Sequence, residues 1–378
     1  MGGEEQAGCG GDVDVIVLAR SGDLRSFLES WRFCLQPFHL IIILQGGGSG
    51  GEVGGGDQKK KAMEVAAGFD AEVYTAADVA SFLGRKLTAA ASSSSLLRSL
   101  SGNACKSFGY LVSKKKWIFC LDDDCVPAVD PSTGFIVDAL RQHVSNLETP
   151  ATPFFFNTLY DPYRDGSDFV RGYPFSLREG VPTAISHGLW LNAPDYDAST
   201  LLAKAEESNR RYVDAVITVP QNVMYSMSSI NLAFDKTLIG AAMFTPPIEG
   251  FISANTTNGT VFRGNSIDDI WAGFCSKSIC DHFGYGVKSG LPYVWHNSSS
   301  KRDLEALHKD NKGLLLLDRI VPFFQSLQLP GNAMTVEDCY LDIAKQVRSR
   351  LSSVDPVFLE LAASMEAWIE AWKTFSPR

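Results

Sequence analysis

The chain has 378 residues, of which 45% are hydrophobic and 20% charged, so it can bury a large core in one domain or two. Its formal net charge of −9 argues against nucleic-acid binding as the main task, because phosphate contacts need a basic surface. No apolar run reaches the roughly 18–20 residues that span a bilayer, so we expect no transmembrane segment. Eight cysteines without a CxxC pair predict free thiols in a reducing compartment.

Alternating strands and helices are predicted along the first third of the chain. Residues 1–11 are Gly-rich and acidic, and we expect them to be disordered. The apolar runs 13–19 and 38–45 are typical of buried parallel strands, with an amphipathic helix near 24–35 between them. The stretch 46–57, mostly glycine and followed by three lysines, indicates a flexible loop rather than a phosphate cradle, because it has neither a GxGxxG pattern nor a Walker lysine.

A third short strand is expected over 69–74, followed by a helix over 76–83, which Thr75 begins, and a helix over 103–112. This alternation predicts an α/β fold with a mostly parallel central sheet of the nucleotide-binding type.

The next strand ends in three carboxylates. Residues 117–121 are apolar and rich in β-forming side chains, and Asp122, Asp123 and Asp124 follow them. Adjacent carboxylates repel one another unless a cation is present, and their hard oxygens suit Mg²⁺ or Mn²⁺. The position also fits, because ligands bind at the carboxyl ends of strands in open α/β sheets. The alternative is a solvated acidic turn in which Asp124 or Asp130 caps a helix.

The remaining two thirds predict further strands and a helical end. We expect a helix over 136–147, a buried strand over 154–156, strands over 214–219 and 231–234, a helix starting at 267 and a helical tail from 336. Segment 157–180 is dense in polar residues, Gly and Pro, and is expected to be an ordered functional loop. We assign one domain to 12–330 and a C-terminal helical tail to 331–378.

Several long blocks resemble one known family, the plant reversibly glycosylated polypeptides, which are UDP-arabinopyranose mutases. The blocks are residues 114–125, 154–164, 168–180, 186–192, 194–197, 212–216, 231–235, 268–273 and 290–296. The resemblance covers most of residues 12–350. It implies a glycosyltransferase-A-like fold, a divalent metal, UDP-sugar substrates, and a cytosolic protein that also associates with the outer face of the Golgi.

The resemblance also implies roles for two arginines of the polar segment. Family members interconvert UDP-arabinopyranose and UDP-arabinofuranose for cell-wall polysaccharides and attach a sugar reversibly to an arginine, which matches Arg171. A second arginine associated with activity matches Arg178. Metal ions on Asp122 and Asp124 would stabilise UDP as the leaving group, and we expect the arginine segment to fold over that cation. Without the resemblance, the preferred interpretation of segment 157–180 is a loop held in place by Arg–Asp ion pairs.

Four further residues have two interpretations each. His187 would hydrogen-bond sugar hydroxyls or be a satisfied core histidine. His296 would be a further ligand of the metal or have a structural role only. Asp268 and Asp269 would act on the sugar or cap the helix that follows them.

Three departures from the active members point to a divergent second class of the family. The second strand of active members ends Gln-Asp-Gly-Asp-Pro, whereas Gln45 is followed here by glycines, so a uridine-side carboxylate is missing. Met-Cys-Gly-Met-Asn has become residues 227–231, with Ser228 and Ser229 in the middle, and the loop 246–258 is also different. We expect a subunit that is inactive or weak alone and assembles with active mutases. The alternative is a competent mutase or self-glycosylating enzyme, as the retained Asp122, Asp124 and Arg171 suggest.

Overall fold

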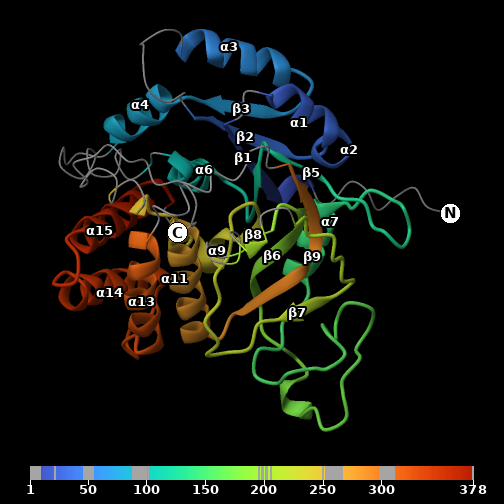
Figure 1. Cartoon of the computed structure of the whole chain (residues 1–378), viewed down its shortest axis with the longest axis vertical. Coiled ribbons are helices and arrows are strands. Elements are labelled where there is room, and N and C mark those ends of the chain that lie inside the picture. Colours follow the sequence, from blue (N-terminus) through green and yellow to red (C-terminus); the bar gives the residue numbers. More distant parts are fainter. Residues whose placement is uncertain are drawn as a thin grey trace.

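The structure is a computed structural model, and its parts are arranged as a central sheet with helices on both faces (Figure 1). The described residues are 10–20, 23–45, 55–86, 100, 102–194, 196, 200, 203–204, 207–248, 251, 267–297 and 311–376. Residues 1–9 of the predicted disordered end, residues 46–54 of the predicted glycine loop and most of the divergent loop 246–258 lie outside them. Within the described part of the chain, no helix combines the length and apolar character needed to cross a bilayer.

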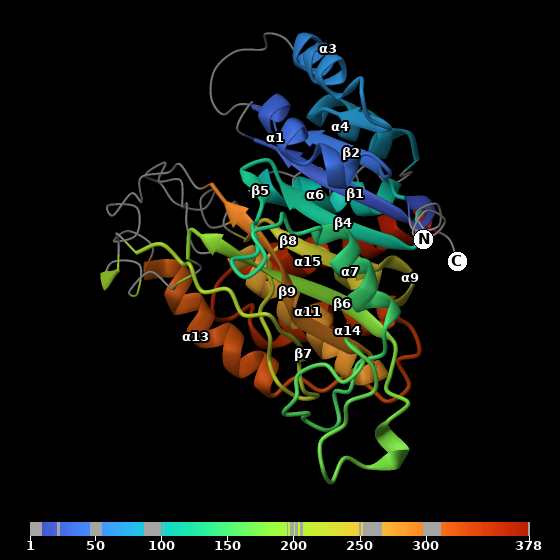
Figure 2. The ribbon, with the colours of Figure 1, turned by 90° about the vertical axis from the view of Figure 1, so that its right-hand side faces the viewer.

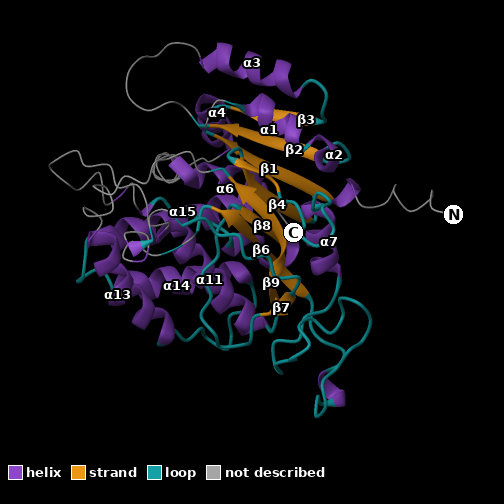
Figure 3. Ribbon diagram, turned by 45° about the vertical axis from the view of Figure 1, so that its right-hand side comes forward, coloured by secondary structure: helices purple, strands orange, loops and turns teal. Residues whose placement is uncertain are grey.

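The sheet is mixed and mostly parallel, and Figure 3 shows its strands in orange between the helices. Its main order is β3-β2-β1-β4-β8-β6-β9-β5, and β7 also pairs with β9. Six strands run in one direction: β1 (Val13–Ala19), β2 (His39–Leu44), β3 (Ala71–Tyr74), β4 (Trp117–Asp122), β6 (Thr183–Asn192) and β9 (Gly286–His296). The strands β5 (Cys125–Pro127), β7 (Val216–Thr218) and β8 (Asn231–Asp235) run opposite to them. The predicted α/β class is therefore confirmed.

Two hydrophobic cores lie on the two faces of the sheet. Alternate residues of β1 divide between them, since Val15 and Val17 face one core and Ile16 and Leu18 the other. The first core includes α1 (Leu24–Ser30), α2 (Arg32–Leu35), α3 (Gly55–Ala66) and α7 (Ala139–Glu148). The second includes α4 (Ala76–Lys86), α6 (Lys106–Val112), α9 (Lys236–Ile239), α11 (Ile267–Phe283), α13 (Asn311–Gln325), α14 (Val336–Arg350) and α15 (Val357–Phe375). The predicted C-terminal helical tail thus packs into the same core as the sheet.

Short 3-10 helices and buried thiols complete the architecture. The 3-10 helices are η1 (Gly10–Asp12), η2 (Gly102–Cys105), η3 (Phe175–Leu177) and η4 (Gly240–Ala242). The seven cysteines that the structure describes are free and buried.

Two local predictions were wrong. Helix α3 begins inside the predicted flexible loop, because the lysine- and alanine-rich residues after Asp57 are good helix formers and Asp57 lies in the first turn, where it favours the helix dipole. Residues 154–156, predicted as a buried strand, form turns with Phe154 and Phe156 exposed. An apolar run needs a partner strand, and here Ala151 pairs with Val181 instead.

Candidate functional site

The carboxyl ends of β1 and β4 place Arg20 against the acidic triplet. The two strands are parallel neighbours with Leu18 opposite Asp122, so the residue that follows β1 lies beside the end of β4. The guanidinium of Arg20 donates to Oδ2 of Asp122 at 2.5 Å, and its backbone N–H donates to Oδ2 of Asp123 at 2.9 Å. One arginine therefore holds two of the three carboxylates.

Lys106 neutralises the other side of Asp122. This lysine is the first residue of α6, is 1% exposed, and its ammonium contacts Oδ1 of Asp122. It also donates to the carbonyl of Ser229 at 2.9 Å and to the hydroxyl of the same residue at 3.1 Å. Both oxygens of Asp122 are thus engaged by cations of the chain itself, which relieves the repulsion within the triplet. The role of Asp122 as a metal ligand stays a prediction.

Asp124 lies beside His296. Strand β5 pairs with β9 so that Cys125 is opposite His296, and Nε2 of His296 is 3.1 Å from Oδ2 of Asp124. Burial acts to raise the pKa of Asp124, but the hydrogen bond and charge of His296, with Arg20 and Lys106, outweigh it and hold the pKa below its usual range.

These side chains fit a divalent cation. One ligand atom each from Asp124, Cys125 and His296 lies within 4.8 Å of the others. Carboxylate oxygen and imidazole nitrogen are suitable donors for Mn²⁺, whereas the thiol of Cys125 is completely buried and directed at Oδ1 of Asp124, at 3.7 Å. Asp124 and His296 are therefore the pair that would hold the metal.

Asp269 approaches the same cluster from the first turn of α11. Its Oδ2 accepts from the backbone N–H of Ser229 at 3.3 Å and from the hydroxyls of Ser228 and Ser229 at 3.5 Å. Burial raises the pKa of Asp269, and Lys106 and the Ser229 bonds only partly offset it. Asp268 is also buried in this turn.

His187 has a protein partner on each ring nitrogen. Its Nε2 accepts from the N–H of Ser228 at 3.1 Å, which assigns the proton to Nδ1, 2.7 Å from the hydroxyl of Tyr225. That hydroxyl donates in turn to Ser289 at 2.6 Å. Burial lowers the pKa of His187 to about 4, so the ring is neutral at neutral pH. These contacts favour the satisfied core histidine over the sugar-binding role.

The arginine segment does not join the cluster. Residues 151–182 lead into Thr183, the amino end of β6, whereas Asp124 and His296 lie where β6 and β9 finish. Figure 2 shows the green segment with the η3 helix at the lower right, away from the arrowheads of β6 and β9. Arg171 is exposed, and the guanidinium of Arg178 stacks on Phe169 and Phe175 at 4.9 and 4.0 Å. The expectation that this segment folds over the cation of its own chain is wrong.

We define the acidic site as Arg20, Lys106, Asp122, Asp124, Asp269 and His296. Sequence reasoning missed Arg20 and Lys106. The position of Arg20 directly after the first strand is a usable signal, and so is a lysine at the start of an otherwise apolar helix. The sequence marked Ser229 only as a difference from the active members, although its carbonyl and hydroxyl accept hydrogen bonds from Lys106.

Comparisons with known proteins agree on one family. The family model for reversibly glycosylated polypeptide matches residues 9–377. The chain is 50% identical to UDP-arabinopyranose mutase 1 of Arabidopsis thaliana over 354 residues, which cover 93% of this chain and 90% of the relative. It is 49% identical to UDP-arabinopyranose mutase 1 of Oryza sativa subsp. japonica (93% and 88% covered) and 48% identical to mutase 3 of A. thaliana (92% and 87%).

Proposed function

Because the chain belongs to the reversibly glycosylated polypeptide family, we propose that it binds a UDP-sugar at the acidic site and takes part in the interconversion of UDP-arabinopyranose and UDP-arabinofuranose. The family resemblance adds a glycosyltransferase-A-like fold and a cytosolic location with peripheral attachment to the Golgi. The observation that carries the proposal is the meeting of Asp124 and His296 beside Arg20 at the carboxyl edge of the sheet.

Ring contraction requires the anomeric C–O bond to break, so that the sugar can close again through a different hydroxyl. A divalent cation on Asp124 and His296 would supply charge stabilisation for the departing diphosphate. Arg20 has a third of its side chain exposed and presents further guanidinium N–H groups, which suit diphosphate oxygens. Lys106 is buried and anchors Asp122, so its part is to hold the end of β4 in place.

We further propose that the chain is weak or inactive alone and works as a subunit with active mutases, in keeping with a divergent second class. The missing carboxylate after Gln45 removes one hydrogen bond to the nucleotide. Losing a bond that involves an ionised group costs about 1.5–3 kcal/mol, on the order of tenfold to a hundredfold in affinity. Ser229 also brings a hydroxyl to Lys106 and Asp269 that the glycine of active members lacks. A competent mutase is the second candidate, favoured by the intact pair of Asp124 and His296.

An activity assay separates the two candidates. The purified chain is incubated with UDP-arabinopyranose and Mn²⁺, alone and with an active relative. We expect little furanose product from the chain alone and more product from the mixture than from the relative by itself. Rapid formation of furanose by the isolated chain would overturn the subunit proposal and favour the second candidate.

Metal binding is tested separately by electron paramagnetic resonance of Mn²⁺. We expect His296→Ala and Asp124→Asn each to weaken binding at least tenfold. His282→Ala is the matched control, because His282 Nε2 lies 3.0 Å from the carbonyl of Ala333 and outside the acidic site. Unchanged Mn²⁺ affinity in both site variants would rule out this pair as the metal ligands.

Sugar attachment is tested by incubating the chain with radioactive UDP-glucose. We expect Arg171→Ala to abolish labelling, and Arg141→Ala, which changes an exposed arginine of α7, to leave it unchanged. Undiminished labelling of the Arg171 variant would show that another residue carries the sugar.

A further inference from the structure

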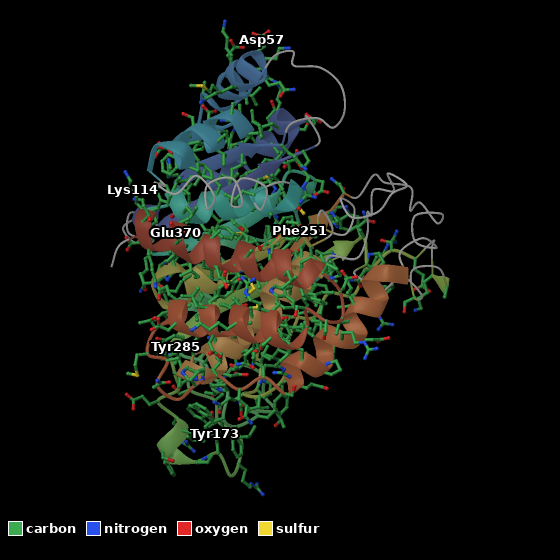
Figure 4. All side chains as sticks on the ribbon, turned by 90° about the vertical axis from the view of Figure 1, so that its left-hand side faces the viewer. Asp57, Lys114, Tyr173, Phe251, Tyr285 and Glu370 are labelled. Atoms are coloured by element: carbon green, nitrogen blue, oxygen red, sulfur yellow. The ribbon has the colours of Figure 1, made fainter. Side chains whose placement is uncertain are left out.

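The turn that carries Arg171 lies far from the acidic site of its own chain. The turn is closed by the N–H of Tyr173 on the carbonyl of Val170, and the ring of Tyr173 packs on Phe155 with centroids 4.7 Å apart. Nearby, the N–H of Thr152 donates to Thr218, which is opposite Lys288 on β9. Figure 4 places Tyr173 at the lower end of the molecule.

The distance follows from the register of β9. Lys288 and His296 are opposite Ser186 and Asn192 of β6, and β9 bulges between Gly290 and Tyr293, so the span equals six regular residues, which at about 3.3 Å per residue is roughly 20 Å. An arginine side chain that carries one hexose is shorter than that span. A sugar released at the acidic site therefore cannot reach Arg171 of the same chain without a large movement of the segment.

The contacts of the segment resist such a movement. Lys288 and Asp161 form an ion pair at 2.7 Å, and both side chains are almost completely buried. The side chain of Asn157 donates to the carbonyl of Asp168 at 3.0 Å and accepts from the N–H of Val170 at 3.0 Å. Arg164 pairs with Asp214 at 2.5 Å, next to β7. The segment is therefore held to the amino end of β9.

The same segment exposes an unusual amount of apolar surface. Phe175 is 83% exposed and Phe156 62%, and Leu159, Tyr160 and Phe154 are each about half exposed. Large exposed apolar patches mark interaction surfaces, because water contact with them is unfavourable. Arg171 is exposed in the same segment, so a partner that covers these side chains would also lie close to the arginine.

We propose that Arg171 of one chain receives its sugar from the acidic site of a second copy, on which the apolar surface around Phe175 docks. This inference rests on the proposed function. The segment and the acidic site lie at opposite ends of β9. In a dimer with a two-fold axis across β9, the segment of each chain therefore faces the acidic site of the other, so both copies can exchange sugar at once.

The transfer balances as a substitution at the anomeric carbon. The bond from that carbon to the diphosphate oxygen breaks, and UDP leaves with the electron pair. A guanidinium nitrogen of Arg171 forms the new C–N bond and loses one proton. Asp168, exposed and three residues away, is available to accept that proton.

Two complementary variants test the proposal. The first carries Arg171→Ala with an intact acidic site, and the second carries Asp124→Asn and His296→Ala with Arg171 intact and a large tag that separates it on a gel. Each is incubated with radioactive UDP-glucose and Mn²⁺ alone, mixed, and after co-expression, so that stable oligomers also contain both chains. Wild-type chain is the positive control.

We expect no label on either variant alone and label on the tagged chain in the combined samples, at no less than a tenth of the wild-type level. Labelled wild type with unlabelled combined samples would show transfer within one chain and overturn the inference. Label on the tagged variant alone would show that the acidic site is not the donor, which also overturns it. An unlabelled wild-type chain would remove the proposed sugar transfer itself, and the inference with it.

A surface variant tests the docking step. Phe175→Ser in an otherwise wild-type chain should slow labelling at least fivefold. The free energy of unfolding should change by no more than about 1 kcal/mol, because the ring is exposed and loses only its stacking contact with Arg178. Val354→Ser, an exposed apolar residue away from the segment, is the control. Labelling that is unaffected by Phe175→Ser would exclude this surface as the contact.

Discussion

The buried ammonium of Lys106 should be one of the most stabilising side chains at the acidic site. Replacing Lys106 with Met keeps an unbranched side chain of similar length in the core but removes the positive charge. Asp122 then retains Arg20 alone, and the carbonyl and hydroxyl of Ser229 lose their donor. Removing one partner of a buried ion pair costs about 3–5 kcal/mol, because the remaining charge is left desolvated. Since Arg20 offsets part of that loss, we expect a decrease of about 3 kcal/mol in the free energy of unfolding.

Urea unfolding followed by tryptophan fluorescence measures this loss. The midpoint should fall without a change in slope, because a change of stability alone leaves the slope constant. Lys345→Met, at an exposed position of α14, is the control and should change the free energy by less than about 0.5 kcal/mol.

A double variant separates lost charge pairing from lost packing. Lys106→Met with Asp122→Asn should recover about half of the loss, because a neutral amide needs no buried counter-charge. A single variant within about 1 kcal/mol of the wild type would refute the reasoning, and so would a double variant no more stable than the single one.

Two further predictions concern stability. His143 is buried between Ser186 and Asn231 and burial lowers its pKa from 6.5 to about 3, so below pH 6.5 the unfolded chain binds a proton that the folded chain does not. The free energy of unfolding, measured with urea, should therefore fall by about 2 kcal/mol at pH 5 relative to its value above pH 6.5 because of this residue. His143→Gln should show a smaller pH dependence. An equal dependence in both chains would contradict the assignment. Gly188→Ala should lower the free energy of unfolding by about 1–3 kcal/mol, because a Cβ there would lie 2.2 Å from Nδ2 of Asn231 and 2.6 Å from the carbonyl oxygen of Pro292. Gly84→Ala is the control: it has open space around it and should leave the free energy of unfolding unchanged in the same experiment.

The sequence alone determined the first part of the sheet and the place where its strands end. The runs that became β1, β2 and β4 are continuous apolar stretches of β-forming residues, a pattern that belongs to strands buried on both faces. From that pattern the position of the triplet Asp122–Asp124 at a carboxyl edge followed directly. The helices after Thr75 and before β4 were predictable for the same reason, since their apolar spacing is local.

Only the tertiary structure decided which side chains meet. His296 contacts Asp124 from 172 residues along the chain, because β9 pairs with β5. Lys106 contacts Asp122 because α6 packs beside the strands of the sheet that precede and follow it. The same geometry placed Arg171 at the amino end of β6, although its segment is close in sequence to the triplet. Whether a segment lies at the carboxyl or the amino end of a sheet depends on the direction and order of the strands. Hydrophobic periodicity carries no information about either, because a strand buries the same faces whichever way it runs.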